Sequence, residues 1–229
     1  RKNPNSEIIK EAKDLNINIK FSYVVVAAKG YKKVKSADIA KISDDKKKLS
    51  NIENIGCDCI CVSGFWTPTI HLASQSGNKT KFKDEIDAFI PSQSKQKETT
   101  LGSANGIFTL EETLKTSFEK GSELSKQITN RENKIAVPAV VEKKSSNHDK
   151  FWCVPLPERK NYKRFLDFQN DVSVSDIQLA LREGYRSIEH VKRYTTLGMA
   201  TDQGRTSNLN GLQLVSDIEN KVVPQVGHT

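Results

Sequence analysis

The chain has 229 residues, 36% of them apolar and 7% aromatic, and its formal net charge is +8. This length and composition allow one or two domains with modest cores. No apolar run approaches the length of a bilayer span and no signal peptide is visible, so we expect a cytoplasmic location.

The positive charge is spread along the chain, in KEAK, KKVK, DDKKK and EKK, often beside acidic residues. It forms no Lys/Arg stripe with interleaved aromatic residues, the pattern that single-strand binders use. We therefore attribute the charge to a generally lysine-rich composition. A basic nucleic-acid-binding module stays open as an alternative, and it predicts an affinity that falls steeply with salt.

The first part of the chain predicts an α/β fold. Residues 8–15 carry apolar side chains at spacings of four and three, which is typical of a helix. Residues 17–28 predict a strand, residues 31–42 a second strand or hairpin partner, and residues 57–63 a further strand. This order indicates part of a nucleotide-binding domain, with parallel strands and a hairpin.

Three cysteines, Cys57, Cys59 and Cys61, alternate along the last of these predicted strands and would share one face. One interpretation is a metal or redox site. However, three side chains in a row along a strand converge poorly on one ion, and buried cysteine behaves as a small hydrophobic residue. We predict that these cysteines belong to the core.

The loop that follows this strand contains Ser63, Gly64 and Trp66. Nucleotides bind outside the carboxyl ends of parallel strands, so this loop is predicted to contact one. Trp66 can stack on a ligand ring or fill the core, and both interpretations stay open. His71, in a short apolar stretch, is interpreted as structural.

A second glycine loop precedes the clearest helix signal, in residues 101–128. Gly102 and Ser103 begin the small-residue run GSANG, and Thr109 with Glu112 matches the capping-box pattern. The positive end of the helix suits a phosphate, and a plain glycine turn before a capped helix explains the same residues equally well.

Residues 129–160 are polar and mixed in charge, which predicts an exposed linker. Residues 161–221 predict a small all-α domain with a capping box at Ser173 and Asp176 and a stop at Gly184. Three short helices bury a small core, so we expect this domain to pack against a neighbour.

The stretch SIEHVKRYTTLGMATDQGRTSN, residues 187–208, organises the helical domain. Its first half predicts a short helix capped by Ser187, and its second half a loop that opens another helix near Ser207. Free backbone N–H groups at a helix start suit an anion. Three cations add to this, Lys192, Arg193 and Arg205. The alternative is a connecting loop beside a solvated basic face.

This stretch, with DFQNDVSVSDIQLALREGYRS before it, resembles the α subunit of heterotetrameric sarcosine oxidase. CDCICVSGFWTPTIHLASQSG and GSANGIFTLEETL are also similar to that family. The resemblance implies an internal fragment. Residues 1–128 would be the C-terminal part of a pyridine-nucleotide/FAD-type domain, and residues 222–229 the start of a folate-binding domain. The fingerprint G-x-G-x-x-G is absent, so the fragment alone is expected to bind NAD poorly.

The helical domain is also similar to bacterioferritin-associated ferredoxin-like domains, in which four cysteines hold an iron–sulfur cluster. The corresponding positions here are Asp167, Gln169, Asp202 and Ser207. Because these clusters need thiolate ligands, we expect no iron–sulfur cluster, and no metal site elsewhere.

The resemblance implies oxidative demethylation of sarcosine to glycine, with methylene transfer to tetrahydrofolate and formation of hydrogen peroxide. The implied partners are the β, γ and δ subunits, with no nucleic acid and no membrane. FAD would lie on the β subunit, FMN at the subunit interface, and NAD and tetrahydrofolate on other parts of the α subunit. The residues expected to contact a cofactor are Ser63, Gly64, Trp66, Gly102, Ser103, Lys192, Arg193, Thr201, Gln203, Gly204, Arg205, Thr206 and Ser207.

The chain contains no Ser/His/Asp elbow, H-E-x-x-H motif or P-loop. His190 has no neighbour in sequence that would orient it as an acid or base, so we assign no catalytic residue. A related amine or opine dehydrogenase complex stays open as an alternative, and cysteines at the four cluster positions would have favoured it.

Overall fold

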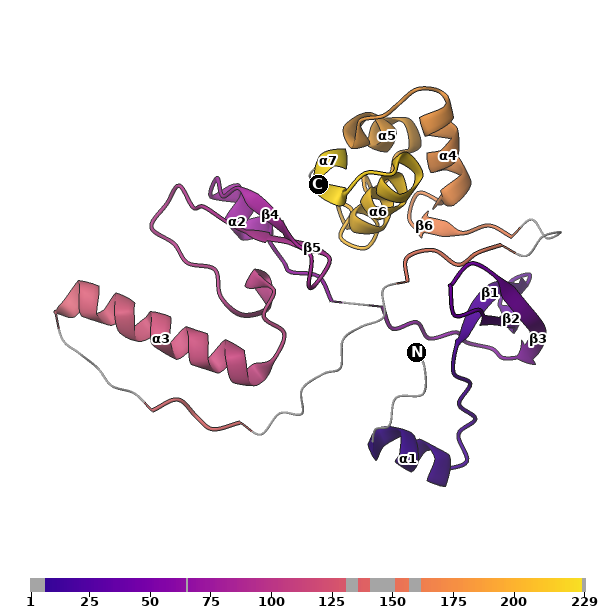
Figure 1. The fold of residues 1–229 in the computed structure, drawn as a ribbon, viewed down its shortest axis with the longest axis horizontal. Helices are drawn as coiled ribbons and strands as arrows, with labels where there is room; N and C mark the ends of the chain where they lie inside the picture. The colour runs from indigo at the N-terminus through magenta and orange to yellow at the C-terminus, as the bar shows by residue number, and fades with distance from the viewer. Residues whose placement is uncertain (1–6, 65, 131–135, 141–150, 157–161, 228–229) are drawn as a thin grey trace. The chain divides into compact units, whose positions relative to one another are not determined.

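The computed structural model describes residues 7–64, 66–130, 136–140, 151–156 and 162–227 (Figure 1). These residues form two compact units, each of which is considered by itself. The first unit combines the described residues of 1–63 with those of 148–221, and the second combines those of 64–147 with those of 222–228.

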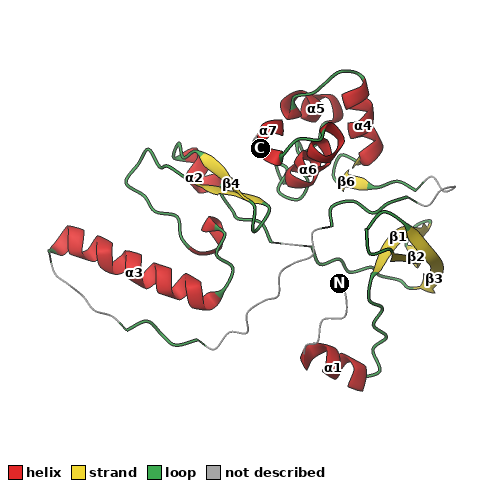
Figure 2. Ribbon diagram, in the orientation of Figure 1, coloured by secondary structure: helices red, strands yellow, loops and turns green. Residues whose placement is uncertain are grey.

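Within its described residues, the first unit contains a three-stranded sheet, a short hairpin and four helices (Figure 2). In chain order these elements are α1 (Glu7–Asp14), β1 (Tyr23–Gly30), β2 (Val34–Ile42), β3 (Leu49–Gly56), β6 (Phe165–Asp167), β7 (Val172–Ser173), α4 (Val174–Arg182), α5 (Ile188–Thr195) and α6 (Asn208–Glu219).

The β1–β2–β3 sheet is antiparallel, and its buried side chains include Val26, Ala37 and Ala40. The β1–β2 pairing confirms the predicted hairpin. The pairings β4–β5 and β6–β7 are antiparallel as well, so the predicted parallel strands are not found among the described residues. A mixed helix and strand fold is present, with small antiparallel sheets in place of a parallel one.

The strand predicted at residues 57–63 is wrong, because β3 ends at Gly56. The Cys57 amide still donates to the Lys35 carbonyl oxygen at 3.1 Å. β2 begins at Val34, however, so the residues after Cys57 have no further partner along that strand. The cysteines that follow therefore leave the sheet.

A buried carboxylate, Asp38 on β2, joins the sheet to a distant part of the chain. Its side chain is 2% exposed and accepts hydrogen bonds from Lys29 Nζ at 2.8 Å, Asn54 Nδ2 at 2.8 Å and the Tyr162 hydroxyl at 2.9 Å. The Lys29 hydrogen bond, followed by the Asn54 one, lowers the pKa of Asp38 to about 2.

Asp38→Asn is expected to destabilise the sheet by about 2 kcal/mol at neutral pH, because charge-assisted hydrogen bonds are lost in a buried site. The pKa of Asp38 is about 2 in the folded chain and about 3.9 for an unperturbed Asp, so the stabilisation is present above pH 4. It is lost as the pH falls through about 2. Hydrogen exchange of β1–β3 peptides measures the effect.

The control for this substitution is Asp58→Asn, since the Asp58 side chain is exposed. The wild type and Asp38→Asn should differ fully at pH 7 and converge between pH 4 and 2. A difference that persists at pH 2 would contradict the role assigned to the Asp38 carboxylate.

Within its described residues, the second unit consists of a β-hairpin, three α-helices and one 3-10 turn. They are α2 (His71–Gln75), β4 (Thr80–Lys83), β5 (Ala88–Pro91), η1 (Gly102–Asn105), α3 (Leu110–Thr129) and α7 (Val223–Val226). All of β5 is buried, and the Phe89 ring packs on Phe82 with centroids 5.2 Å apart. α3 begins after Thr109 as predicted, but the Thr109 side chain forms no capping hydrogen bond.

The helical part of the first unit confirms the short helices predicted from the sequence. Ser173 donates its backbone N–H and its hydroxyl to the Asp176 carboxylate, at 2.8 and 2.7 Å, at the start of α4. Figure 1 shows α4, α5 and α6 packed together. The core between them includes side chains that are each 1% exposed or less, namely Ile177, Ala180, Ile188, Val191, Leu197, Leu212 and Val215.

The two compact units divide the chain differently from the predicted domains, which were 1–128, 129–160, 161–221 and 222–229. Residues 1–63 belong to the same unit as the helical part, and the Asp38–Tyr162 hydrogen bond is one contact between these segments. Much of the predicted linker, including KKSSNHDK, lies outside the described residues.

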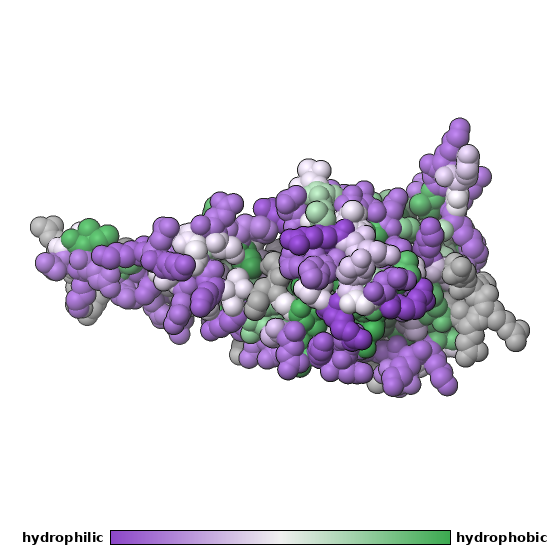
Figure 3. Space-filling view, turned by 90° about the horizontal axis from the view of Figure 1, so that it is seen from above, coloured by the Kyte–Doolittle hydropathy of each residue, from purple (hydrophilic) through white to green (hydrophobic). Residues whose placement is uncertain are grey.

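The face drawn in Figure 3 is mostly hydrophilic, with small hydrophobic areas. α3 follows this pattern, because none of its residues is fully buried. Among the described helices, none is both long and apolar enough to cross a bilayer.

Candidate functional site

The loop between α5 and α6, residues 196–207, has a tightly turned backbone. Gly198 and Gly204 have φ values of 69° and 76°, in the left-handed region that favours glycine. Asn208, the first residue of α6, lies against both of them. A β-carbon at Gly198 would lie 2.0 Å from Asn208 Oδ1, and one at Gly204 would lie 2.2 Å from Asn208 Cγ. Neither position accepts a side chain without displacing Asn208.

The first anchor of this loop is Asp167, at the end of β6, whose side chain is 2% exposed. Its Oδ2 accepts the Gly198 N–H at 2.9 Å and the Ser207 hydroxyl at 3.4 Å. Its Oδ1 accepts the N–H groups of Gln169 at 2.9 Å and Asn170 at 3.2 Å. The Asp167 carboxylate thus holds both ends of the loop, and it also stabilises the turn that follows Asp167 itself.

The second anchor is Asp202, inside the loop. Its carboxylate accepts the Thr206 hydroxyl at 2.7 Å, the Thr206 N–H at 3.1 Å and the Gly204 N–H at 3.1 Å. The hydrogen bond from the Thr206 hydroxyl is the main cause that lowers the pKa of Asp202, and the loop amides and the Gln169 side chain lower it further. Asp202 is therefore a stable anion at neutral pH.

These two carboxylates occupy backbone donors that the sequence predicted to be available to an anion. The N–H groups of Gly198, Gly204 and Thr206 bind Asp167 or Asp202. Because these N–H groups are occupied, the cationic side chains of α5 and the loop are the groups that can attract an external anion.

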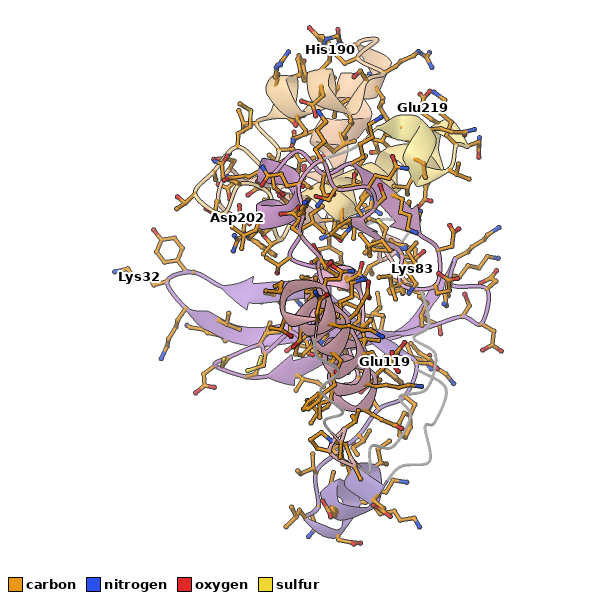
Figure 4. The ribbon with its side chains drawn as sticks, turned by 90° about the vertical axis from the view of Figure 1, so that its left-hand side faces the viewer. Lys32, Lys83, Glu119, His190, Asp202 and Glu219 are labelled. Carbon is orange, nitrogen blue, oxygen red and sulfur yellow. The ribbon has the colours of Figure 1, made fainter. Side chains whose placement is uncertain are left out.

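Three such cations lie on α5 and the loop. Lys192 is half-buried, and Arg193 and Arg205 are exposed. In the described part of the chain, none of the three forms an ion pair. His190 points outward from the same helix (Figure 4). Two of these cations therefore lie on α5, which also carries the acidic Glu189, and the third lies on the anchored loop.

Comparison with known proteins identifies the relatives of this chain. Residues 161–229 match the family model described as "Sarcosine oxidase A3 domain". The sarcosine oxidase subunit alpha of Rhizobium meliloti is 35% identical over 183 residues, which is 77% of this chain and 18% of that protein. Those of Corynebacterium sp. strains U-96 and P-1 are 29% and 28% identical and cover 85% and 79% of this chain.

The chain is a relative of the sarcosine oxidase α subunit. It spans about a fifth of the length of the curated α subunits that it matches. Among solved structures, L-proline dehydrogenase from P. horikoshii has a TM-score of 0.61 and 19% identity, with 97% of this chain and 44% of that chain covered. At this identity the likeness concerns the fold alone.

In this α-subunit relative, two of the four positions where ferredoxin-like domains carry cysteine are hydrogen-bonded to each other. The Ser207 hydroxyl donates to Asp167 at 3.4 Å, and the Gln169 side chain lowers the pKa of Asp202. The carboxylates of Asp167 and Asp202 therefore hold the loop at positions where thiolates would bind a cluster. The sequence comparison singled out these positions, but it did not indicate that they anchor the loop.

The remaining residues predicted on the loop are also placed by the structure. Thr201, Gln203 and Thr206 are exposed, whereas Gly204 and Ser207 are buried. The Gln203 side chain donates to the Ala200 carbonyl oxygen at 2.9 Å, and the Thr206 hydroxyl donates to the Asp202 carboxylate. Gly204, Thr206 and Ser207 shape the loop, and their contact with FMN stays a prediction.

The other two predicted groups lie outside the helical part. Ser63, Gly64 and Trp66 are exposed, and the Trp66 side chain, 76% exposed, fills no core. Its ring meets Phe108 edge-on with centroids 6.4 Å apart. Gly102 is buried and Ser103 exposed on η1. Stacking of Trp66 on a ligand stays a prediction.

Sequence reasoning did not find Asn208. The signal was available, because two glycines six residues apart precede an asparagine that starts a helix. The backbone conformation expected for each glycine alone does not reveal that both glycines leave room for the Asn208 side chain.

Proposed function

We propose that this chain is part of the α subunit of a sarcosine oxidase complex. The complex would demethylate sarcosine oxidatively to glycine, transfer the methylene group to tetrahydrofolate and form hydrogen peroxide. The observation that carries the proposal is the similarity to three sarcosine oxidase α subunits over about 80% of the chain.

Within this complex, the α5–α6 loop is proposed to face FMN at the interface with the β subunit. Lys192, Arg193 and Arg205 supply positive charge that an FMN phosphate or an acidic partner surface would complement. The anchoring by Asp167 and Asp202 supports this role, since it fixes the loop that carries Arg205 and follows directly after the helix of Lys192 and Arg193. The loop would bind and orient, and FMN would supply the redox chemistry.

FAD, which would oxidise the amine, is proposed to lie on the β subunit. NAD and tetrahydrofolate would bind elsewhere on the full-length α subunit. The γ and δ subunits complete the proposed heterotetramer. The proposed role of this chain is to position FMN and to form the subunit interface, and none of its residues is assigned to the chemical step.

The test is co-expression of the full-length α chain with its β, γ and δ partners, followed by assay of the purified complex. Sarcosine should yield glycine and hydrogen peroxide in equal amounts, and added tetrahydrofolate should capture the methylene group. Reduction of an artificial dye by proline or an opine, without peroxide formation, would instead assign the chain to an amine dehydrogenase complex. Salt-sensitive nucleic-acid binding without amine oxidation would overturn both assignments.

A further inference from the structure

Two exposed thiols lie side by side after the end of β3. Cys59 and Cys61 are exposed, and their sulfur atoms are 3.8 Å apart. The core location predicted for them is wrong, because the backbone leaves the sheet after Gly56. The proposed function uses neither thiol.

We propose that Cys59 and Cys61 form a reversible dithiol–disulfide pair that responds to the thiol redox state of its surroundings. Its oxidant would be a small disulfide such as oxidised glutathione. The proposal stands on the sulfur contact and the exposure of both groups, and it is independent of the amine-oxidising function.

The irregular backbone is what allows the two sulfurs to meet. In a strand, alternate residues lie about 6.6 Å apart, and their β-carbons point the same way at a similar separation. A disulfide needs β-carbons about 3.5 to 4.5 Å apart and sulfurs at about 2.05 Å. With the sulfurs at 3.8 Å in an irregular segment, the pair needs only a short approach to bond.

Two thiol–disulfide exchanges would oxidise the pair. The hydrogen bond with Cys61 raises the pKa of the Cys59 thiol. One sulfur of the pair, as a thiolate, would attack one sulfur of oxidised glutathione and release one glutathione thiolate. The other sulfur of the pair would then lose its proton, attack the mixed disulfide and release the second glutathione. The chain is oxidised by two electrons and one glutathione disulfide is reduced to two thiols.

The other cysteines provide contrasting cases. Cys57 is half-buried and its amide is still bonded to the sheet. Cys153 is also half-buried, and its sulfur accepts a hydrogen bond from Arg164 Nη1 at 3.1 Å. A bulky oxidant reaches exposed thiols more easily than half-buried ones, so it should react with Cys59 and Cys61 in preference to Cys57 and Cys153.

A disulfide between residues two apart closes a very short loop, so it constrains the unfolded chain little and carries strain. Such disulfides are easily reduced, and labile disulfides are the regulatory ones. The pair also lies just before Ser63, the last residue of the first unit in this stretch. Oxidation would therefore stiffen the segment that leads from one unit to the other.

The full-length chain should be equilibrated in glutathione buffers of graded composition, and free thiols then blocked with N-ethylmaleimide. Cleavage before Asp58 and Asp84 gives a peptide that contains Cys59 and Cys61 but not Cys57. In oxidising buffer this peptide should be two hydrogen atoms lighter and unlabelled, while Cys57 and Cys153 are labelled. Reduced glutathione should restore both labels.

Cys59→Ser and Cys61→Ser should each abolish the internal bridge and leave the remaining thiol joined to glutathione. Cys153→Ser is the matched control and should change nothing. The proposal is overturned if both thiols remain labelled in oxidising buffer. It is also overturned if the 58–83 peptide is bridged to Cys57, to Cys153 or to a second chain.

Discussion

Asp167→Ala is expected to destabilise the helical part of the first unit by about 3 to 4 kcal/mol, because buried donors would lose their acceptor. The carboxylate accepts three backbone N–H groups, from Gln169, Asn170 and Gly198, within a site that is 2% exposed. The loop between α5 and α6 should open first, since its start is fixed to Asp167 through Gly198.

Hydrogen exchange of peptides from α4 to α6 measures this local opening. Asp167→Asn should give an intermediate effect, because the amide keeps one acceptor oxygen but turns a donor toward either the N–H groups of Gln169 and Asn170 or the Gly198 N–H and Ser207 hydroxyl. Glu183→Ala, an exposed substitution at the end of α4, is the control and should change exchange little. Protection in Asp167→Ala equal to that of the control would refute the anchoring role.

Gly204→Ala is the second substitution with a large expected effect, about 2 to 3 kcal/mol. Two causes combine: the φ of 76° costs a non-glycine residue about 1 kcal/mol, and the new β-carbon would lie 2.2 Å from Asn208 Cγ. Asn208 cannot move away freely, because it also lies against Gly198. Thermal unfolding and exchange of α6 peptides measure the cost.

A double-mutant cycle separates these two causes. Asn208→Ala should itself cost little, since its Oδ1 has no hydrogen-bond partner and its Nδ2 bond to the Gln203 carbonyl oxygen is 3.5 Å long. In the double variant Gly204→Ala/Asn208→Ala, the steric cost should disappear and about 1 kcal/mol should remain. Strictly additive costs would show that Asn208 and residue 204 do not interact.

The helical part was predictable because local signals and packing agree there. Ser173 and Asp176 mark the start of α4, and the apolar spacing in α4 to α6 matches the buried side chains Ile177, Val191 and Leu212. Each signal lies within a few residues of the structure that it specifies, so it needs no knowledge of distant partners.

The hairpin prediction was confirmed, but the strand at residues 57–63 and the parallel order were not, because strand pairing depends on residues far apart in sequence. The run CDCICVS has strand-like alternation, yet pairing stops at Gly56 because β2 begins at Val34. The antiparallel order likewise depends on which strands pair with each other. The alternation of apolar and polar residues within one strand does not specify its partner. The buried Asp38, bonded to Tyr162 across 124 positions, depends on the same kind of distant contact.

At the candidate site, the sequence located the loop and its cations but not how the loop is held. A glycine loop before a helix suggests free N–H groups, and the chain's own carboxylates take them up. Asp167 lies 31 residues before Gly198, so this pairing is visible only in three dimensions. The cofactor contacts stay a proposal.

The most direct test of the central claim is the FMN content of the purified complex. In the triple variant Lys192→Ala/Arg193→Ala/Arg205→Ala, FMN retention should weaken at least tenfold, because each charge-assisted contact contributes about 1 kcal/mol or more. The matched control removes the same charge at Lys32 (Figure 4) and Lys33, which are exposed in the turn between β1 and β2, and at Lys35, which is exposed near the start of β2.

Flavin released by acid and separated by chromatography distinguishes FMN from FAD. The triple variant should lose FMN and keep FAD, while the control retains both. A triple variant with full FMN and full sarcosine turnover would contradict it, and the α5–α6 loop would then be a structural connection only.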